Sequence, residues 1–135
     1  MPSLFTKIIN GEIPCYKIAE DENNLAFLDI FPLKKGHVLV VPKLEVDQLF
    51  DLPEQNYLNL LAFSKKISIT LKQIIPCNRI SMHVVGLEVP HAHIHLIPLD
   101  HVADVNFERE KVSMSRQELE DLASAVFGKF TASVG

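Results

Sequence analysis

Three histidines alternate with apolar residues at positions 91–96, which read His-Ala-His-Ile-His-Leu, and this alternation restricts how the chain can fold. Successive side chains of a β-strand point to opposite faces of a sheet, so a strand here places the three imidazoles on one face and the three apolar side chains on the other. The apolar face has to be buried, and three imidazoles on one face are costly unless each finds polar partners. The segment His91–Pro98 is therefore predicted to be a strand with a core face and a functional face.

The remaining segments predict an α+β domain around this strand. Short apolar or β-branched runs bounded by turn residues indicate further strands at Lys17–Glu20, Leu25–Ile30, Val38–Val41 and Arg79–Val85. Helices are predicted at Leu4–Ile9 with Ser3 as its cap, at Pro53–Ile75, and from Arg116 to about Phe127 after the capping box Ser115-x-x-Glu118. We expect one domain, residues 1–135, of about five mostly antiparallel strands with one long helix and a C-terminal helix.

Composition excludes several classes of partner. The net charge is −4 with acids and bases interspersed, so the basic face typical of nucleic-acid-binding proteins is missing. No apolar run approaches the ~18 residues of a membrane span, and the N-terminus lacks the layout of a signal peptide. Cys15 and Cys77 form no C-x-x-C pair and are predicted to be reduced, half-buried thiols. We therefore expect a cytoplasmic protein with no nucleic-acid or membrane partner.

The residues alone leave three uses open for the histidines. An exposed polar face of an edge strand tolerates histidine, although strict alternation of three is unusual for such a face. A zinc site can use imidazoles two residues apart, but His91 and His95 would lie roughly 13 Å apart on a straight strand, and no cysteine completes the set. The third use is a histidine nucleophile flanked by two histidines that bind and polarise phosphate.

The string at positions 91–97 resembles the signature of the histidine triad superfamily. Three upstream segments fit the same family in order and spacing: Phe5 to Pro14, Ala26-Phe27-Leu28-Asp29-Ile30, and Gly36 to Lys43. By size and pattern the chain is most similar to the branch of small histidine triad nucleotide-binding proteins. The likeness extends from Leu4 to about Pro98.

The resemblance implies a role for each matching position. His93 would be the nucleophile that forms a nucleotidyl-histidine intermediate, His91 and His95 the flanking histidines that orient it and contact phosphate oxygens, and His37 the fourth histidine on a neighbouring strand. Asp29 would accept hydrogen bonds from the ribose hydroxyls. An apolar slot for the base would be formed by Leu4, Phe5, Ile8, Phe27, Leu28 and Ile30, of which Leu4, Ile8 and Ile30 fit plain core packing equally well.

Two departures from the family pattern limit what is carried over. Many relatives have a C-x-x-C near the start that helps to bind structural zinc, whereas this chain has Ser3 and Thr6, so no metal is expected. Where many members have glutamine and a hydroxyl residue that protonates the leaving group, this chain has Leu87 and Glu88. Leu87 would contact phosphate only through its backbone N–H, and Glu88 would act as an acid only with a raised pKa, or would bind a cationic leaving group.

The function implied is hydrolysis or nucleotidyl transfer at the α-phosphorus of a nucleoside phosphoramidate or an adenylate. The substrate would be a purine nucleotide, the enzyme would need no cofactor, and its assembly would be a homodimer. Three alternatives remain: a dinucleoside polyphosphate hydrolase, a nucleotide-binding module with little catalysis, and a metal carrier. Leu87 and Glu88 favour the binding module, and the intact set of four histidines favours activity.

Overall fold

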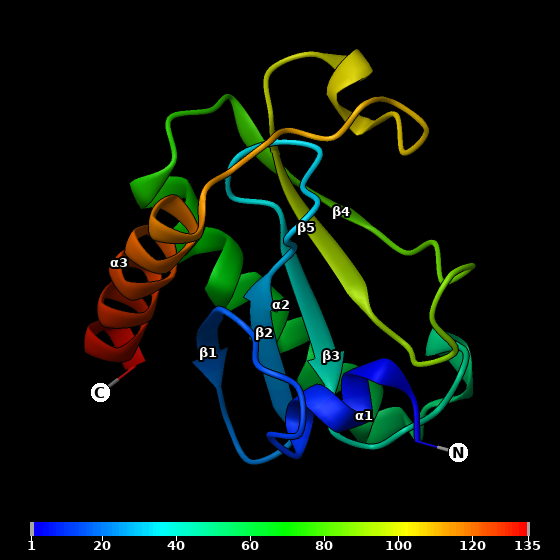
Figure 1. The fold of residues 1–135 in the computed structure, drawn as a ribbon. Coiled ribbons are helices and arrows are strands. Elements are labelled where there is room, and N and C mark those ends of the chain that lie inside the picture. Colours follow the sequence, from blue (N-terminus) through cyan, green and yellow to red (C-terminus); the bar gives the residue numbers. More distant parts are fainter. Residues whose placement is uncertain (1, 135) are drawn as a thin grey trace.

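A single antiparallel sheet organises the computed structural model, which describes residues 2–134 (Figure 1). The strands lie in the order β1-β2-β3-β5-β4. Their bounds are Lys17–Glu20 for β1, Asn24–Leu28 for β2, Val38–Pro42 for β3, Arg79–His83 for β4 and Ile94–Leu99 for β5. The helices are α1 at Leu4–Ile9, α2 at Glu54–Ile74 and α3 at Arg116–Val134, with short 3₁₀ turns at Leu49–Asp51 and Val102–Val105. This arrangement confirms the predicted α+β fold class.

The two faces of the sheet are buried by different helices. Helices α2 and α3 cover one face, and the short helix α1 lies on the opposite face (Figure 1). Ala92, Ile94 and Leu96 belong to the cluster beneath α2 and α3, as the alternating pattern predicts. The cluster beneath α1 consists of Phe5, Leu25, Phe27, Leu39 and Val41. The three histidines therefore extend toward the face that carries α1.

Strand register brings aromatic and imidazole side chains into one row across the sheet. Phe27 of β2 lies opposite Leu39 of β3, which lies opposite His95 of β5. His95 in turn lies opposite His83 of β4. Residues directly opposite one another in antiparallel strands share a face, so His83 joins the functional face.

Three strand boundaries differ by two residues or more from those predicted. Strand β5 begins at Ile94 rather than His91, because the register Val40↔Ile94 would pair Ala92 with Pro42, which has no N–H to donate. Residues 91–93 instead use other partners, such as the bond from the Ala92 N–H to the Val46 carbonyl at 2.7 Å. Strand β2 ends at Leu28 and β4 at His83, each two residues earlier than predicted.

The helix caps follow the predicted signals, whereas the end of α3 does not. Ser3 Oγ accepts a hydrogen bond from the Thr6 N–H, and Ser115 and Glu118 exchange both bonds of a capping box. Helix α3 continues past Phe127 to Val134, because Val126 and Phe130 extend its buried stripe. The Phe130 ring packs edge-on against Phe63 of α2 at 5.8 Å. The buried face of α3 therefore continues beyond the predicted end at about Phe127, and so does the helix.

A glycine sets the entry of the chain into β3. Gly36 has a φ of +92°, and a Cβ at this position would lie 3.0 Å from Ile75 Cγ1 and 3.1 Å from Pro98 Cγ. Both the backbone angle and the space therefore require glycine. The turn places His37 immediately before β3, which pairs with β5.

Two further expectations from the sequence concern membrane spans and the cysteines. Within residues 2–134, none of the helices combines the length and the apolar character needed to cross a membrane. Cys15 and Cys77 are free and half-buried, which confirms the predicted state of both thiols.

Candidate active site

The ring of His93 has one nitrogen bound and the other available. Its Nδ1 lies 2.7 Å from the carbonyl oxygen of His91. A carbonyl only accepts hydrogen bonds, so Nδ1 carries the proton and donates, and Nε2 of the neutral ring keeps its lone pair. Phe5 contacts the ring edge-on at 5.0 Å and helps to exclude water. His93 therefore presents an unprotonated nitrogen from a rigid, buried position.

His91 orients His93 but is not placed to bind phosphate through its side chain. The side chain is fully buried, with Nε2 2.8 Å from the carbonyl oxygen of Pro42 and Nδ1 2.7 Å from Ser3 Oγ. Nε2 must donate to the carbonyl, so Nδ1 accepts the proton of the Ser3 hydroxyl. With both ring nitrogens engaged, the predicted phosphate contact by His91 does not fit this geometry. The predicted orienting role does, through its carbonyl oxygen.

His37 and His95 belong to a chain of hydrogen bonds in which each group donates to the next, from Leu33 through His37 to His95. The backbone N–H of Leu33 donates to Nδ1 of His37 at 3.1 Å, so the proton of this ring lies on Nε2. Nε2 of His37 lies 2.9 Å from Nδ1 of His95, which must accept. The proton of His95 is therefore on Nε2, where it can donate to a phosphoryl oxygen.

All three rings are uncharged at neutral pH because they are buried. Burial lowers the pKa of His37 to about 4 and that of His95 to about 3. The pKa of His37 is lowered further by repulsion from Lys111 and from His83 when that ring is protonated, and the pKa of His95 by repulsion from the other histidines when they are protonated. Burial also lowers the pKa of His93, although the hydrogen bond to the His91 carbonyl opposes this effect. The site thus combines a neutral nucleophile with a neutral donor.

Asp29 follows β2 and lies beside His37. Its Oδ2 is 3.6 Å from Nε2 of His37, and its Oδ1 accepts the Phe31 N–H at 2.8 Å. Burial raises the pKa of this carboxyl, and the bond from Phe31 counteracts the rise. The carboxylate keeps acceptor capacity at the rim of the site, as its predicted contact with ribose requires.

Asp29, His37 and His95 are also spaced like metal ligands. One donor atom from each lies within 4.8 Å of the others. The tautomer of His37 opposes this use, because the Leu33 N–H occupies the lone pair of Nδ1 and leaves the proton on Nε2, the nitrogen that faces the other two groups. A metal ion at Nε2 would require that proton to be lost and the bond from Leu33 to be broken.

The predicted apolar slot is only partly assembled. Phe5 and Phe27 pack edge-on at 5.7 Å in the cluster beneath α1, and Ile8 packs against the same cluster. Leu28 is a misplaced prediction, because its side chain is buried in the opposite cluster beneath α2. Ile30 and Leu4 are exposed at 52% and 46%, so both are accessible from solvent rather than packed in the core.

Leu87 and Glu88 lie in the loop between β4 and the histidines. Leu87 is 88% exposed and belongs to neither of the two core clusters formed by the described residues. Glu88 is exposed yet close enough to raise the pKa values of Asp29 and His93. This end of the site is therefore open and carries one carboxylate, while Lys111 brings a positive charge close enough to lower the pKa values of Asp29 and His37.

Residues 10–102 match the HIT domain, the domain of the histidine triad proteins. An uncharacterized HIT-like protein of Methanocaldococcus jannaschii is 44% identical over 101 residues, which make up 70% of this chain and 77% of that protein. The chain belongs to the HIT family. The adenosine 5′-monophosphoramidase of Schizosaccharomyces pombe is 38% identical over 102 residues, 73% of this chain and 74% of the relative. Relatives with this name support nucleotide hydrolysis as an activity at the level of the HIT family.

Solved HIT structures share the architecture. A HIT-like protein of Bartonella henselae has a TM-score of 0.81 at 26% identity, over 94% of this chain and 95% of that one. A HIT family protein of Bacillus anthracis has a TM-score of 0.71 at 32% identity, over 93% of this chain and 94% of that one. These similarities confirm the HIT fold.

The structural zinc expected of many HIT proteins does not suit this chain. The matching positions, Ser3 and Thr6, contribute hydroxyls, and His91 Nδ1 already accepts the proton of Ser3. Glu45 closes the group by accepting hydrogen bonds from Thr6 Oγ1 at 2.6 Å and from the Ser3 N–H at 2.7 Å. Hydroxyls are poor zinc ligands compared with thiolates, and the hydroxyls of Ser3 and Thr6 already donate hydrogen bonds to other groups. Sequence reasoning noted the two hydroxyl residues but had no signal for Glu45.

Phe107 is a further contact that sequence reasoning missed. It lies in the connection after β5 and packs edge-on against His95 at 5.0 Å, His83 at 5.9 Å and His37 at 6.3 Å. A bond of 2.8 Å from the Val112 N–H to the Pro32 carbonyl ties this connection to the turn before β3. Phe107 thus covers one end of the HIT site as Phe5 covers the other.

Removing the Phe107 ring should hydrate His95. In Phe107→Ala we expect the pKa of His95 to rise from about 3 toward its usual range, since burial is the main cause of its low value. The free energy of unfolding should fall by about 1 to 2 kcal/mol. The measurement is a titration of the histidine ring signals by NMR between pH 7 and 4. Phe50→Ala removes an 81% exposed ring away from the histidines and should leave them unchanged, so an equal response in both variants would contradict this role.

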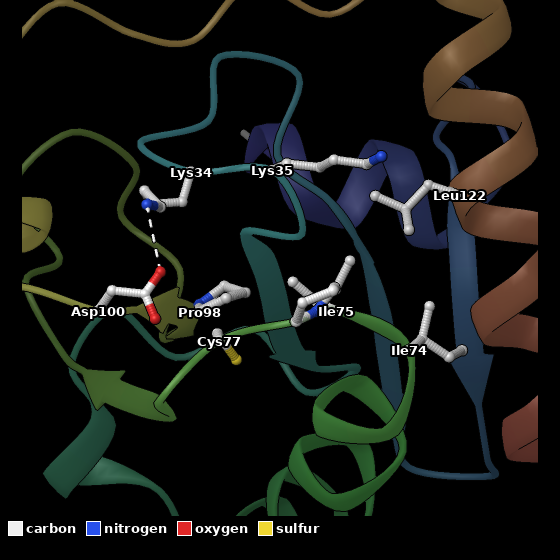
Figure 2. A pocket seen from close by; sticks show the side chains of 9 residues that line it. Lys34, Lys35, Ile74, Ile75, Cys77, Pro98, Asp100 and Leu122 are labelled. Carbon is white, nitrogen blue, oxygen red and sulfur yellow. Dashed lines mark ion pairs between the residues drawn. The ribbon is translucent and has the colours of Figure 1, made fainter.

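A separate hollow of about 320 Å³ lies away from the histidines (Figure 2). Its walls come from Lys34, Lys35, Asp100 and Leu122 together with residues 74–77 and Pro98. Lys34 is paired with Asp100 at 4.0 Å and with Asp104 at 3.5 Å. None of the predicted site residues lines this hollow, so it is not part of the HIT site.

Proposed function

We propose that this HIT protein is a nucleotide hydrolase or nucleotidyl transferase in which Nε2 of His93 attacks the α-phosphorus of a nucleoside phosphoramidate or an adenylate. The observation that carries the proposal is the bond between Nδ1–H of His93 and the His91 carbonyl, because it leaves a nucleophilic lone pair on the other nitrogen. The lowered pKa of His93 keeps that lone pair available at neutral pH.

The first step replaces the leaving group by the imidazole. The lone pair of Nε2 forms an N–P bond, and the P–N bond to the leaving amine breaks, so the amine departs with its electron pair and takes one proton from solvent. The ring gains positive charge, which the His91 carbonyl stabilises through Nδ1–H. The Nε2–H of His95 donates to a phosphoryl oxygen whose negative charge grows in the transition state.

The second step returns the enzyme to its starting state. A water oxygen bonds to phosphorus, the N–P bond breaks, and its electron pair returns to Nε2 of His93. The water gives one proton to solvent, which balances the proton taken up by the amine. One water is consumed overall, and a nucleoside monophosphate and an amine are released.

The surroundings of His93 support a nucleotide as the substrate. Ile8 and the buried rings of Phe5 and Phe27 form one apolar cluster beside the nucleophile that a base would contact, and Asp29 offers acceptors for ribose hydroxyls. The open end at Leu87 and Glu88 would receive the leaving group. The Glu88 carboxylate repels a polyphosphate and attracts a cationic amine, so a phosphoramidate with a cationic leaving group is favoured over a dinucleoside polyphosphate.

The test is turnover of a fluorogenic adenosine phosphoramidate in the presence of a chelator. We expect kcat/KM to exceed that for a diadenosine polyphosphate by at least roughly tenfold, since each 1.4 kcal/mol of repulsion is worth that factor. The pH profile should be bell-shaped, because His93 must be neutral and a proton must reach the leaving group. Tight binding of AMP without turnover would identify a binding module instead. Stoichiometric zinc in the purified protein would favour the metal carrier.

We further propose a cytoplasmic homodimer. Strand β4 is at an edge of the sheet, and Met82, Val84 and Val85 are exposed there and apolar. A two-fold interface is the commonest way for identical chains to cover such a surface. Sedimentation of the purified chain tests the oligomeric state.

A further inference from the structure

We propose that Thr6 and Glu45 are positioning residues for the nucleophile, because a continuous chain of hydrogen bonds connects them through Ser3 and His91 to the ring of His93. This inference rests on the proposed function of His93 and identifies which residues outside the site set its orientation. It begins from the hydrogen bond of 2.7 Å between the His93 ring and the carbonyl oxygen of His91, the one polar contact of this ring within residues 2–134.

The first link concerns the position of the His91 carbonyl. The His91 side chain is fully buried, and bonds to the Pro42 carbonyl at 2.8 Å and to Ser3 Oγ at 2.7 Å hold its two ring nitrogens. The segment is outside the β3–β5 ladder, which begins at Ile94. Two backbone bonds also hold this segment, from the His91 N–H to the Val89 carbonyl at 2.8 Å and from the Ala92 N–H to the Val46 carbonyl at 2.7 Å. The side-chain bonds of His91 add to them in fixing the oxygen that orients His93.

The second link concerns the direction of the Ser3 hydroxyl. Because Nε2 of His91 donates to a carbonyl, Nδ1 needs a donor, and the Ser3 hydroxyl is that donor. Ser3 Oγ also accepts the Thr6 N–H at 3.0 Å, which leaves the hydroxyl proton free to point at His91. Thr6 Oγ1 lies 3.3 Å from Ser3 Oγ and would compete for that proton if its own partner were missing.

The third link is the carboxylate of Glu45. One oxygen, Oε1, accepts the Thr6 hydroxyl at 2.6 Å and the Ser3 N–H at 2.7 Å. The bond to Glu45 directs the Thr6 proton away from Ser3, and the bond from Ser3 N–H fixes the start of α1 against the segment after β3. An exposed glutamate and a helix-start threonine thereby act on a buried ring two residues beyond His91.

The experiment uses two pairs of variants in the full chain. Thr6→Val removes the hydroxyl with little change in shape, whereas Thr6→Ser keeps it. Glu45→Ala removes the acceptor, and Glu45→Gln keeps one acceptor oxygen. In Thr6→Val the Glu45 carboxylate loses the Thr6 hydroxyl and can accept the Ser3 proton instead, and in Glu45→Ala the Thr6 hydroxyl can accept it. For the phosphoramidate we expect kcat to fall roughly tenfold in both variants, with KM changed less than about twofold, because orientation of the nucleophile is lost while substrate contacts remain. Thr6→Ser and Glu45→Gln should keep kcat within about threefold of the wild-type value.

A matched control separates positioning from stability. Glu118 accepts the Ser115 N–H at 3.0 Å at the start of α3, so Glu118→Ala removes a helix-start carboxylate that does not connect to the histidines. It should lower stability and leave kcat unchanged. Equal losses of kcat in Glu118→Ala and Glu45→Ala, or no loss in Thr6→Val, would overturn the proposal.

A second readout does not depend on turnover. In ¹⁵N-histidine NMR spectra, wild-type His93 should show a single tautomer protonated at Nδ1, and Thr6→Val should show a mixture of tautomers or exchange broadening at this ring. If the wild-type chain turns over no nucleotide, the proposed function fails, but these spectra still decide the positioning chain. Identical His93 signals in wild type and Thr6→Val would overturn it.

Discussion

Replacing His93 by alanine is expected to reduce turnover of an adenosine phosphoramidate by about 10⁴-fold or more, which corresponds to about 5.5 kcal/mol of lost transition-state stabilisation. The loss is large because the variant removes the nitrogen that forms the bond to phosphorus, and no neighbouring ring can replace it. His91 has both ring nitrogens engaged, and His95 presents a protonated Nε2. Binding of AMP should persist, because the aromatic surface and Asp29 remain.

The control for this variant is His101→Ala, which removes an exposed histidine in the connection after β5. Its turnover should equal that of the wild type within about twofold, as for most surface substitutions away from a site. Single-turnover rates by rapid quench separate chemistry from product release. If His93→Ala kept more than about a tenth of the wild-type rate, the nucleophile would have to be a different group.

The free energy of unfolding is expected to fall as the pH decreases from 7 to 5. In the unfolded chain His37 and His95 take up protons near the ordinary pKa of 6.5, whereas in the folded protein they do so only near about 4 and about 3. Between these limits the unfolded chain binds more protons, so acid favours it. At pH 5 the loss should be on the order of 2 to 4 kcal/mol for the pair. Urea unfolding curves at a series of pH values measure it.

Two comparisons separate the contribution of the histidines from that of the carboxylates. Glu45 and Asp104 have pKa values lowered to about 2 by hydrogen bonds, so their contributions are lost at lower pH than those of the histidines, as the pH falls below the ordinary carboxyl values of 4.5 and 3.8. Replacing His95 by asparagine removes the histidine with the lower of the two values and should reduce the slope between pH 7 and 5, while His37, His93 and His83, whose pKa values burial also lowers, retain the rest. A free energy of unfolding that stays constant over this range would contradict the burial of uncharged histidines.

Periodicity predicted much of the fold, and the errors in the predicted boundaries come from contacts between elements that are distant in sequence. The alternation at positions 91–96 correctly predicted which side chains reach the core, since Ala92, Ile94 and Leu96 are buried beneath α2. It did not predict where the ladder starts, because that depends on Pro42 of a different strand, which lacks an N–H. The end of α3 was missed because Phe130 is stabilised by Phe63, a contact that no local signal announces.

The candidate site was likewise predicted only in part from the sequence. Sequence placed the four histidines and Asp29 in one region, where the structure brings them together. It could not say which nitrogen of each ring is protonated, because that depends on carbonyls and N–H groups contributed by Leu33, Pro42 and His91 itself. Phe107 and Glu45 lie far from the motif in sequence and reach it only through tertiary packing.

Covalent trapping of the nucleotidyl group is the most direct measurement of the mechanism. The protein is mixed with an adenosine phosphoramidate, quenched under alkaline conditions within one turnover, digested, and its peptides sequenced by mass spectrometry. We expect an adenylyl group on the peptide that contains His93, absent from His93→Ala. Turnover with no nucleotidyl-protein species at any quench time, or an adenylyl group on a different residue, would contradict a histidine nucleophile at position 93.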